Sequence, residues 1–164
     1  KIIKEGNNKM DKPIQHFYPE ELCKCYGCGL KNDQGLQLKS YWNGEEAVAR
    51  FTPQKQHIAL PGYVYGGLLA SLIDCHGVGT AAAVATAEHK SPAEDQDIPM
   101  QRYVTASLHV YFKRPTPLGE ELFLRGWLKE ERGNKLVVEV EISVKDEVKV
   151  RGEVVAAPMP ETMK

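Results

Sequence analysis

Apolar and polar positions alternate with a period of two in two parts of this chain, which is typical of strands with one wet face. The first part comprises residues 36–42 and 46–52, which flank Asn43-Gly44, the strongest short hairpin signal. The second part runs from Tyr103 to Ala157 and is divided into four segments by turn residues. The pattern predicts two antiparallel strands before, and four after, a central segment of different period.

The central segment, residues 66–87, has the period of a helix. One arc of this helix is apolar: Leu68, Leu69, Leu72, Ile73 and His76. Another arc carries small residues and one carboxylate: Gly67, Ala70, Ser71, Asp74 and Val78. We expect the sheet to cover the first arc, with His76 buried and hydrogen-bonded, and a ligand or partner to cover the second. Gly77 and Gly79 each cost about 1 kcal/mol inside a helix, so we expect close packing there.

One long helix on one antiparallel sheet of about six strands is an α+β architecture. The 164 residues, 42% hydrophobic and 26% charged, suit a single globular domain. We divide the chain into a loose lead-in, residues 1–22, and a main domain, residues 23–160. Within the second strand region, strict alternation would put Thr105 on the same face as Ser107 and His109.

The overall charge and hydropathy of the chain give no sign of a nucleic-acid or membrane partner. The formal net charge is −1, so nothing indicates binding to nucleic acid or to an anionic membrane. No apolar run approaches the roughly 20 residues that a membrane span needs, and no signal-peptide pattern precedes Pro13. We therefore expect a cytoplasmic protein.

Four cysteines are present, and three of them cluster as Cys23-x-Cys25-x-x-Cys28. Structural zinc sites usually need two spaced pairs of ligands, and no second pair follows at a finger-like distance. Cys75 stands apart in the sequence, next to Asp74. We therefore expect reduced structural thiols in a glycine-rich turn, and no metal.

The stretch from Gly66 to Asp74 carries the strongest chemical signal. Glycines at a helix start leave backbone N–H groups unshielded at the positive end of the helix dipole, so Gly66 and Gly67 can hold a developing oxyanion. Asp74 is a candidate base or nucleophile, and the alternative is an ordinary solvated aspartate. The two groups lie roughly 12 Å apart along one helix, whereas one reacting carbonyl must meet both. A catalytic site would therefore be shared between two protomers.

Three local sequences resemble the hotdog-fold thioesterase superfamily, and within it the phenylacetyl-CoA thioesterase-like proteins. The first is Cys25-Tyr-Gly-Cys-Gly-x-x-Asn-x-x-Gly-Leu, which is similar to an entry motif of one branch. The second and most specific is Pro61-Gly-x-x-Tyr-Gly-Gly-(x)6-Asp74, and the third runs from Val104 to Gly119. The resemblance extends over about residues 23–157, which is most of the chain.

The resemblance implies a hotdog fold, a homodimer or dimer of dimers, and hydrolysis of an acyl-CoA thioester without a cofactor. It implies that the N–H groups of Gly66 and Gly67 polarise the thioester carbonyl. Asp74 of the facing protomer would activate water or attack directly, and Thr105 would position the water.

The resemblance also implies a substrate-binding set. Lys113 and Arg114 would meet the phosphates of CoA. Tyr65 stands where the family usually has a histidine, and Ala59 where some relatives have an asparagine whose place His57 or Gln56 would take.

Two other functions remain open from the sequence. The departures at Tyr65 and Ala59 favour a non-catalytic protein that binds acyl-CoA or another acyl ligand. An enoyl-thioester hydratase needs a histidine that works with a carboxylate, and His57 is the only histidine in the loop before the helix.

Overall fold

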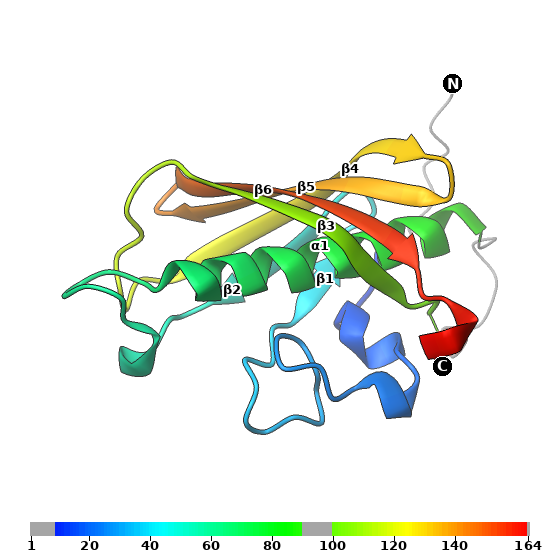
Figure 1. The fold of residues 1–164 in the computed structure, drawn as a ribbon, viewed down its shortest axis with the longest axis horizontal. Helices are drawn as coiled ribbons and strands as arrows, with labels where there is room; N and C mark the ends of the chain where they lie inside the picture. Colours follow the sequence, from blue (N-terminus) through cyan, green and yellow to red (C-terminus); the bar gives the residue numbers. More distant parts are fainter. Residues whose placement is uncertain (1–8, 90–99, 164) are drawn as a thin grey trace.

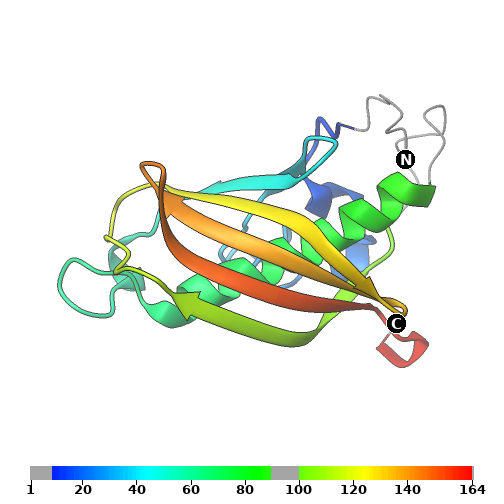
Figure 2. The ribbon, with the colours of Figure 1, turned by 90° about the horizontal axis from the view of Figure 1, so that it is seen from above.

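The structure is a computed structural model that describes residues 9–89 and 100–163. One antiparallel sheet curves around one long helix, α1 (Gly66–His89), as Figures 1 and 2 show. The strands are β1 (Ser40–Trp42), β2 (Ala47–Phe51), β3 (Tyr103–Phe112), β4 (Leu122–Arg132), β5 (Lys135–Val144) and β6 (Glu147–Pro158). Short 3-10 helices lie at Ile14–Phe17, Glu20–Leu22, Lys55–His57 and Glu161–Met163. The predicted α+β architecture, with a central helix and six strands, is confirmed.

The strands follow the order β1-β2-β4-β5-β6-β3, and every neighbouring pair is antiparallel. The predicted hairpin closes at Asn43, whose side-chain oxygen accepts the N–H groups of Glu45 and Glu46 at 3.0 and 2.9 Å. The first strand begins only at Ser40, because Gln37 has a φ of 50° and interrupts the extended chain. Strand β3 forms one edge of the sheet, opposite the edge formed by β1 (Figure 2).

The apolar arc of α1 packs on the sheet as predicted: Leu68, Leu69, Leu72, Ile73 and His76 are all buried. By length and composition the stretch Gly66–Ala87 would pass as a membrane span, contrary to the expectation that no run comes close. In this fold, however, 83% of that apolar window is buried within the protein itself, as in the core helix of a globular domain.

Residues 9–22 are not the loose lead-in expected from their composition. Ile14, Gln15 and Tyr18 are at most 7% exposed, and the side-chain oxygen of Gln15 accepts the N–H of Ser40 at 3.0 Å. Figure 1 shows this segment on the side of α1 that faces away from the sheet. The small arc of α1 is therefore covered partly by the chain itself, and not only by a ligand or partner.

The two mid-helix glycines differ in how closely they pack. A Cβ placed on Gly77 would lie 2.5 Å from Cγ2 of Val154 in β6, which is closer than real side-chain contacts allow. A Cβ placed on Gly79 would meet nothing nearer than the Gln15 side chain at 3.6 Å, an ordinary contact. Close packing against the sheet thus explains Gly77 alone.

Replacing these glycines by alanine should give opposite results. Gly77→Ala should lower the free energy of unfolding by about 1–3 kcal/mol, because the new methyl group forces helix and sheet apart. Gly79→Ala is the matched control and should be neutral or raise that free energy by up to about 1 kcal/mol through helix propensity. Urea unfolding measures both values. Equal destabilisation by the two substitutions would contradict the packing argument.

His76 is fully buried between the helix and the sheet. Its Nε2 lies 3.1 Å from the carbonyl oxygen of Ala47, which can only accept, so Nε2 carries the proton. Its Nδ1 then accepts the hydroxyl of Ser40 at 2.8 Å. Burial lowers the pKa of His76 to about 4, against the small opposing effect of the bond to Ala47. The predicted buried histidine is confirmed.

Stability should fall in mild acid because of His76. The unfolded chain protonates this residue near pH 6.5 and the folded chain only near pH 4, so its contribution is full above about 6.5 and is lost as the pH falls. At pH 5 the loss should be about 2 kcal/mol. His76→Gln cannot titrate, and its unfolding free energy should change less between pH 7.5 and 5. Parallel pH profiles for the two proteins would contradict this account.

Candidate active site

Asp74 and Thr105 lie together, although 31 positions separate them in the sequence. The Thr105 hydroxyl on β3 donates a hydrogen bond to Oδ1 of Asp74 on α1. Both residues line a cavity of about 490 Å³, which is open to solvent. Part of its wall is apolar and is formed by Leu22, Val78, Met159 and Met163. The arrangement fixes one carboxylate oxygen of Asp74 and leaves the other for a water molecule or a substrate.

The surroundings of Asp74 keep its pKa above the usual range of a carboxyl group. Burial is the largest cause, because it disfavours the charged form. The hydrogen bond from Thr105 opposes this rise, a charge on Cys25 adds to it, and Arg102 opposes it. A carboxylate with a raised pKa is a better proton acceptor than an exposed one, which suits a general base.

A β-bulge turns Thr105 toward the helix. The pairing of β3 with β6 shifts between Thr105 and Ser107, so that Thr105 pairs with Ala156 and Leu108 pairs with Val154. Paired residues share a face, and Val154 packs on Gly77 of α1. Leu108 and Thr105 therefore both face the helix although they are an odd number of residues apart. The expectation that Thr105 shares a face with Ser107 and His109 is wrong, because strict alternation cannot anticipate an extra residue.

Three cysteines line the same cavity. The sulfur atoms of Cys25, Cys28 and Cys75 all lie within 4.8 Å of one another, and those of Cys25 and Cys75 are 3.8 Å apart. All three thiols are free, and Cys28 is buried. Cys75 is far from the other three cysteines in the sequence, and the signal that it joins the cluster is Gly27, where a Cβ would lie only 2.3 Å from the Cys75 sulfur.

The thiols influence one another strongly. The pKa of Cys25 is lowered because the thiols of Cys28 and Cys75 donate to its sulfur, as do the backbone N–H groups of Cys28 and Gly27. The pKa of Cys28 is raised to about 11, chiefly by its bond to Cys25. The pKa of Cys75 is raised chiefly by its bonds to Cys25 and Cys28. A negative charge in this cluster is therefore best placed on Cys25.

The predicted oxyanion site lies at the N-terminal end of α1, eight residues before Asp74. Gly66 begins α1, and the carbonyl of Tyr65 accepts the N–H of Leu68 at 3.1 Å, so the N–H groups of Gly66 and Gly67 precede the first helical hydrogen bond. The Tyr65 ring lies over Gly67, where a Cβ would meet it at 2.3 Å. His57 holds this loop through its carbonyl, which accepts the Tyr65 N–H at 2.8 Å.

Gly66 and Asp74 belong to the same continuous helix. Eight residues at about 1.5 Å each separate them by roughly 12 Å. One chain therefore cannot offer both groups to the same carbonyl.

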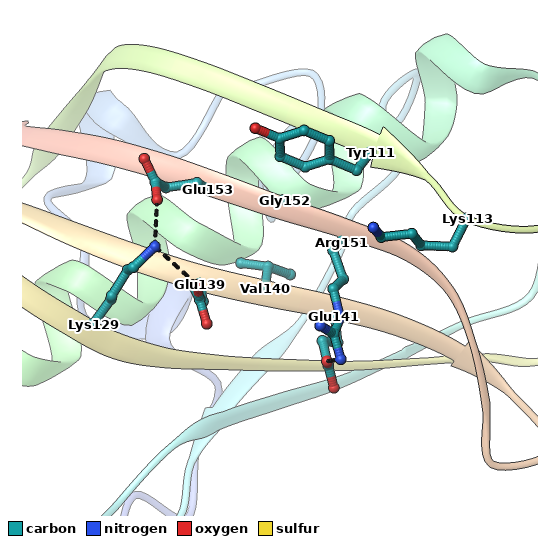
Figure 3. A pocket seen from close by; sticks show the side chains of 9 residues that line it. All are labelled: Tyr111, Lys113, Lys129, Glu139, Val140, Glu141, Arg151, Gly152 and Glu153. Atoms are coloured by element: carbon teal, nitrogen blue, oxygen red, sulfur yellow. Dashed lines mark hydrogen bonds and ion pairs between the residues drawn. The ribbon is translucent and has the colours of Figure 1, made fainter.

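Lys113 and Arg114 lie away from the Asp74 cavity. Lys113 lines a separate cavity of about 250 Å³ on the outer face of the sheet, seen in Figure 3 with α1 behind the strands. There Lys129 is shared by Glu139 and Glu153, at 3.0 and 2.8 Å. The Nε of Arg114 pairs with Glu147 at 2.9 Å.

The fold and the carboxylate on its central helix define a hotdog-type protein, and comparisons identify the family. The family model of the thioesterase superfamily matches residues 61–151, more than half of the chain. A thioesterase superfamily protein from Shewanella loihica is 44% identical, with a TM-score of 0.62 and coverage of 83% of this chain and 94% of that one. The chain therefore belongs to the thioesterase superfamily.

More distant solved structures share the fold alone. The PaaI protein from the phenylacetic acid degradation operon of E. coli is 16% identical, with a TM-score of 0.60 and coverage of 76% of this chain and 81% of that one. A Streptococcus mutans protein bound to acetyl CoA is 12% identical, with a TM-score of 0.56 and coverage of 70% and 82%. No curated protein matches this chain.

Proposed function

We propose that the protein is an acyl-CoA thioesterase whose active sites form between two copies of the chain. The observation that carries the proposal is the hydrogen bond from Thr105 to Asp74 in the wall of an open, partly apolar cavity. Membership of the thioesterase superfamily supports the reaction class. The acetyl CoA found with the Streptococcus mutans protein supports CoA as the carrier group.

The chemistry needs a base and an oxyanion site. A water molecule on the free oxygen of Asp74 loses a proton to the carboxylate as its oxygen attacks the thioester carbon. The developing oxyanion is stabilised by N–H groups at a helix start. The carbon–sulfur bond then breaks, and the CoA thiolate takes the proton from Asp74. Direct attack by the carboxylate is the second route, through an anhydride that water then opens.

Pairing of the edge strand β3 with β3 of a second copy would bring the Asp74 of one chain to the helix start of the other. At one end of β3, Thr105 contacts Asp74; at the other, Phe112 lies beside Gly66, where a Cβ would be 3.3 Å from its ring. Two copies of β3 that pair antiparallel about an axis near Leu108 set Thr105 opposite Phe112 of the partner subunit. Asp74 then meets Gly66 of the partner subunit.

Exposure along β3 favours this pairing. Leu108, Tyr111 and Phe112 are 37, 54 and 57% exposed on an edge strand of ten residues. A long edge with apolar side chains is a template for a second strand. The same pairing would join two sheets into one continuous sheet, and further association of such dimers would give a dimer of dimers.

The substrate would lie across both subunits. The apolar wall beside Asp74 suits the acyl chain, with Val78 and Met159 among its residues. Lys113 and Arg114 directly follow Phe112, whose ring lies beside Gly66. From the end of the strand, cations there could reach CoA phosphates that extend out of the site over the sheet. Tyr65 and His57 border the same helix start.

Removing the carboxylate should stop turnover without unfolding the protein. We expect Asp74→Asn to lower kcat at least about 100-fold, since a general base contributes that much or more. Thr105→Val should lower kcat about tenfold, and Thr105→Ser, which keeps the donor, should recover most of it. Chromatography of released CoA over a panel of acyl-CoA thioesters measures the rates and avoids thiol reagents that would modify the protein.

Asp33→Asn is the matched control, since it makes the same chemical change at an exposed turn. Full activity in Asp74→Asn would rule out the carboxylate as the catalytic group. Saturable acyl-CoA binding by the wild type with no CoA release across the panel would replace hydrolysis by ligand binding. Loss of enoyl absorbance without CoA release would indicate a hydratase.

Mixed dimers test whether the two halves of a site come from different chains. Gly66→Pro removes one N–H donor at a position where proline suits a helix start, and Gly66→Ala is the control that keeps it. Gly66→Pro and Asp74→Asn should each be nearly inactive. Randomly mixed at equal amounts, they should recover about a quarter of wild-type activity, because half of the dimers contain one intact site.

Subunit mixing must be shown with two differently tagged chains purified in series. No recovery in such verified mixed dimers would mean that the site lies within one chain. A wild-type monomer by light scattering at assay concentration, with full activity, would contradict the shared site as well.

A further inference from the structure

The three-cysteine cluster has the dimensions of a metal site. Zinc binds thiolates at about 2.3 Å, which in a tetrahedron separates the sulfur atoms by about 3.8 Å. The sulfur atoms of Cys25 and Cys75 are 3.8 Å apart, and Cys28 lies within 4.8 Å of both. In the part of the chain that the structure describes, this is the one group of histidine, cysteine or acidic side chains with such geometry.

The loop that supplies two of these thiols is held in place by its backbone. The N–H of Gly29 donates to the carbonyl of Cys25 at 2.8 Å, which closes a tight turn around the Cys25-x-x-Cys28 pair. The backbone N–H groups of Gly27 and Cys28 help to lower the pKa of the Cys25 thiol. Such N–H groups stabilise a thiolate whether or not a metal is bound.

Glycine lets this loop approach the helix. A Cβ on Gly27 would lie 2.3 Å from the Cys75 sulfur, so a side chain at this position would separate the loop from the third thiol. A Cβ on Gly29 would lie 2.5 Å from the backbone nitrogen of Cys25. The two glycines therefore let the three sulfur atoms come close together. Ordinary packing of three small side chains would not need so close an approach.

The surroundings also suit a charged centre. Three thiolates and one divalent cation carry a net charge of −1, and Arg102 lines the same cavity. The Arg102 guanidinium stacks on the Tyr18 ring at 4.1 Å from its centroid, which fixes a positive charge near the cluster. The cavity gives access for the ion and for a fourth ligand, such as water.

We propose that Cys25, Cys28 and Cys75 form a thiolate site for a soft divalent cation, zinc above all, with its fourth position toward the cavity. Binding displaces the remaining thiol protons to solvent, and no electron is transferred. The site ties the N-terminal loop to α1 next to Asp74. The inference is independent of the proposed hydrolase activity, because metal binding is measured directly.

Cobalt and zinc test the site in the reduced, chelator-stripped full-length chain. Co²⁺ should give the strong near-ultraviolet band of thiolate ligation and the visible bands of a tetrahedral ion, saturating at about one equivalent per chain. Zn²⁺ should abolish both. Zn²⁺ should also raise the Tm of the wild type.

Single serine substitutions identify the ligands. Cys25→Ser, Cys28→Ser and Cys75→Ser should each weaken Co²⁺ binding at least about 100-fold and remove the Tm shift with Zn²⁺. Cys23→Ser is the matched control and should bind as the wild type does, because the Cys23 thiol donates instead to the carbonyl of Pro19 at 3.4 Å. Circular dichroism identifies the variants that remain folded, and half-exposed Cys25 is the one best able to tolerate the change.

Two results would overturn the proposal. One is the absence of the thiolate–cobalt band in the reduced wild type at one equivalent of Co²⁺. The other is equal weakening in Cys23→Ser, or full binding in a folded Cys25→Ser variant, either of which would place the metal elsewhere.

Discussion

The fold depends on the need to cover one helix on every side. Between Gly66 and Ala87, Asp74 is the only charged residue of α1, so the helix cannot present an ordinary solvated face. The sheet buries one arc, and the N-terminal segment with Ile14 and Tyr18 buries part of the opposite side. What remains open is the rim between that segment and β3. The one carboxylate of the helix lies at this rim, in a cavity that the layers leave between them.

Most of the fold follows from the period of the sequence. The switch from two-residue to helical period at Gly66 and back at Tyr103 locates α1 and β3, and Asn43-Gly44 locates the first hairpin. The N-terminal layer could not be predicted in this way. Its buried residues are few and irregularly spaced among polar ones, and 3-10 turns have no periodic signature long enough to detect.

The candidate site was predictable by residue type, but its geometry was not. A lone aspartate on a small-residue arc and a threonine on a strand are visible in the sequence, and the resemblance named both. Their hydrogen bond depends on the bulge at Thr105, which no hydropathy pattern records. The addition of Cys75 to the cysteine cluster depends on Gly27, whose role appears only when the loop and the helix are seen together.

The bulge has a further consequence for how such a site changes over evolutionary time. Substitutions in β3 alter one side chain and leave the others facing as before. Deletion of Ala106 would instead remove the bulge and restore a regular ladder. The side chains of the residues before the deletion would then point to the opposite face of the sheet, and the hydroxyl of Thr105 would point away from the helix. A one-residue change in the length of β3 would therefore separate Asp74 from the Thr105 hydroxyl more completely than a substitution elsewhere in the strand.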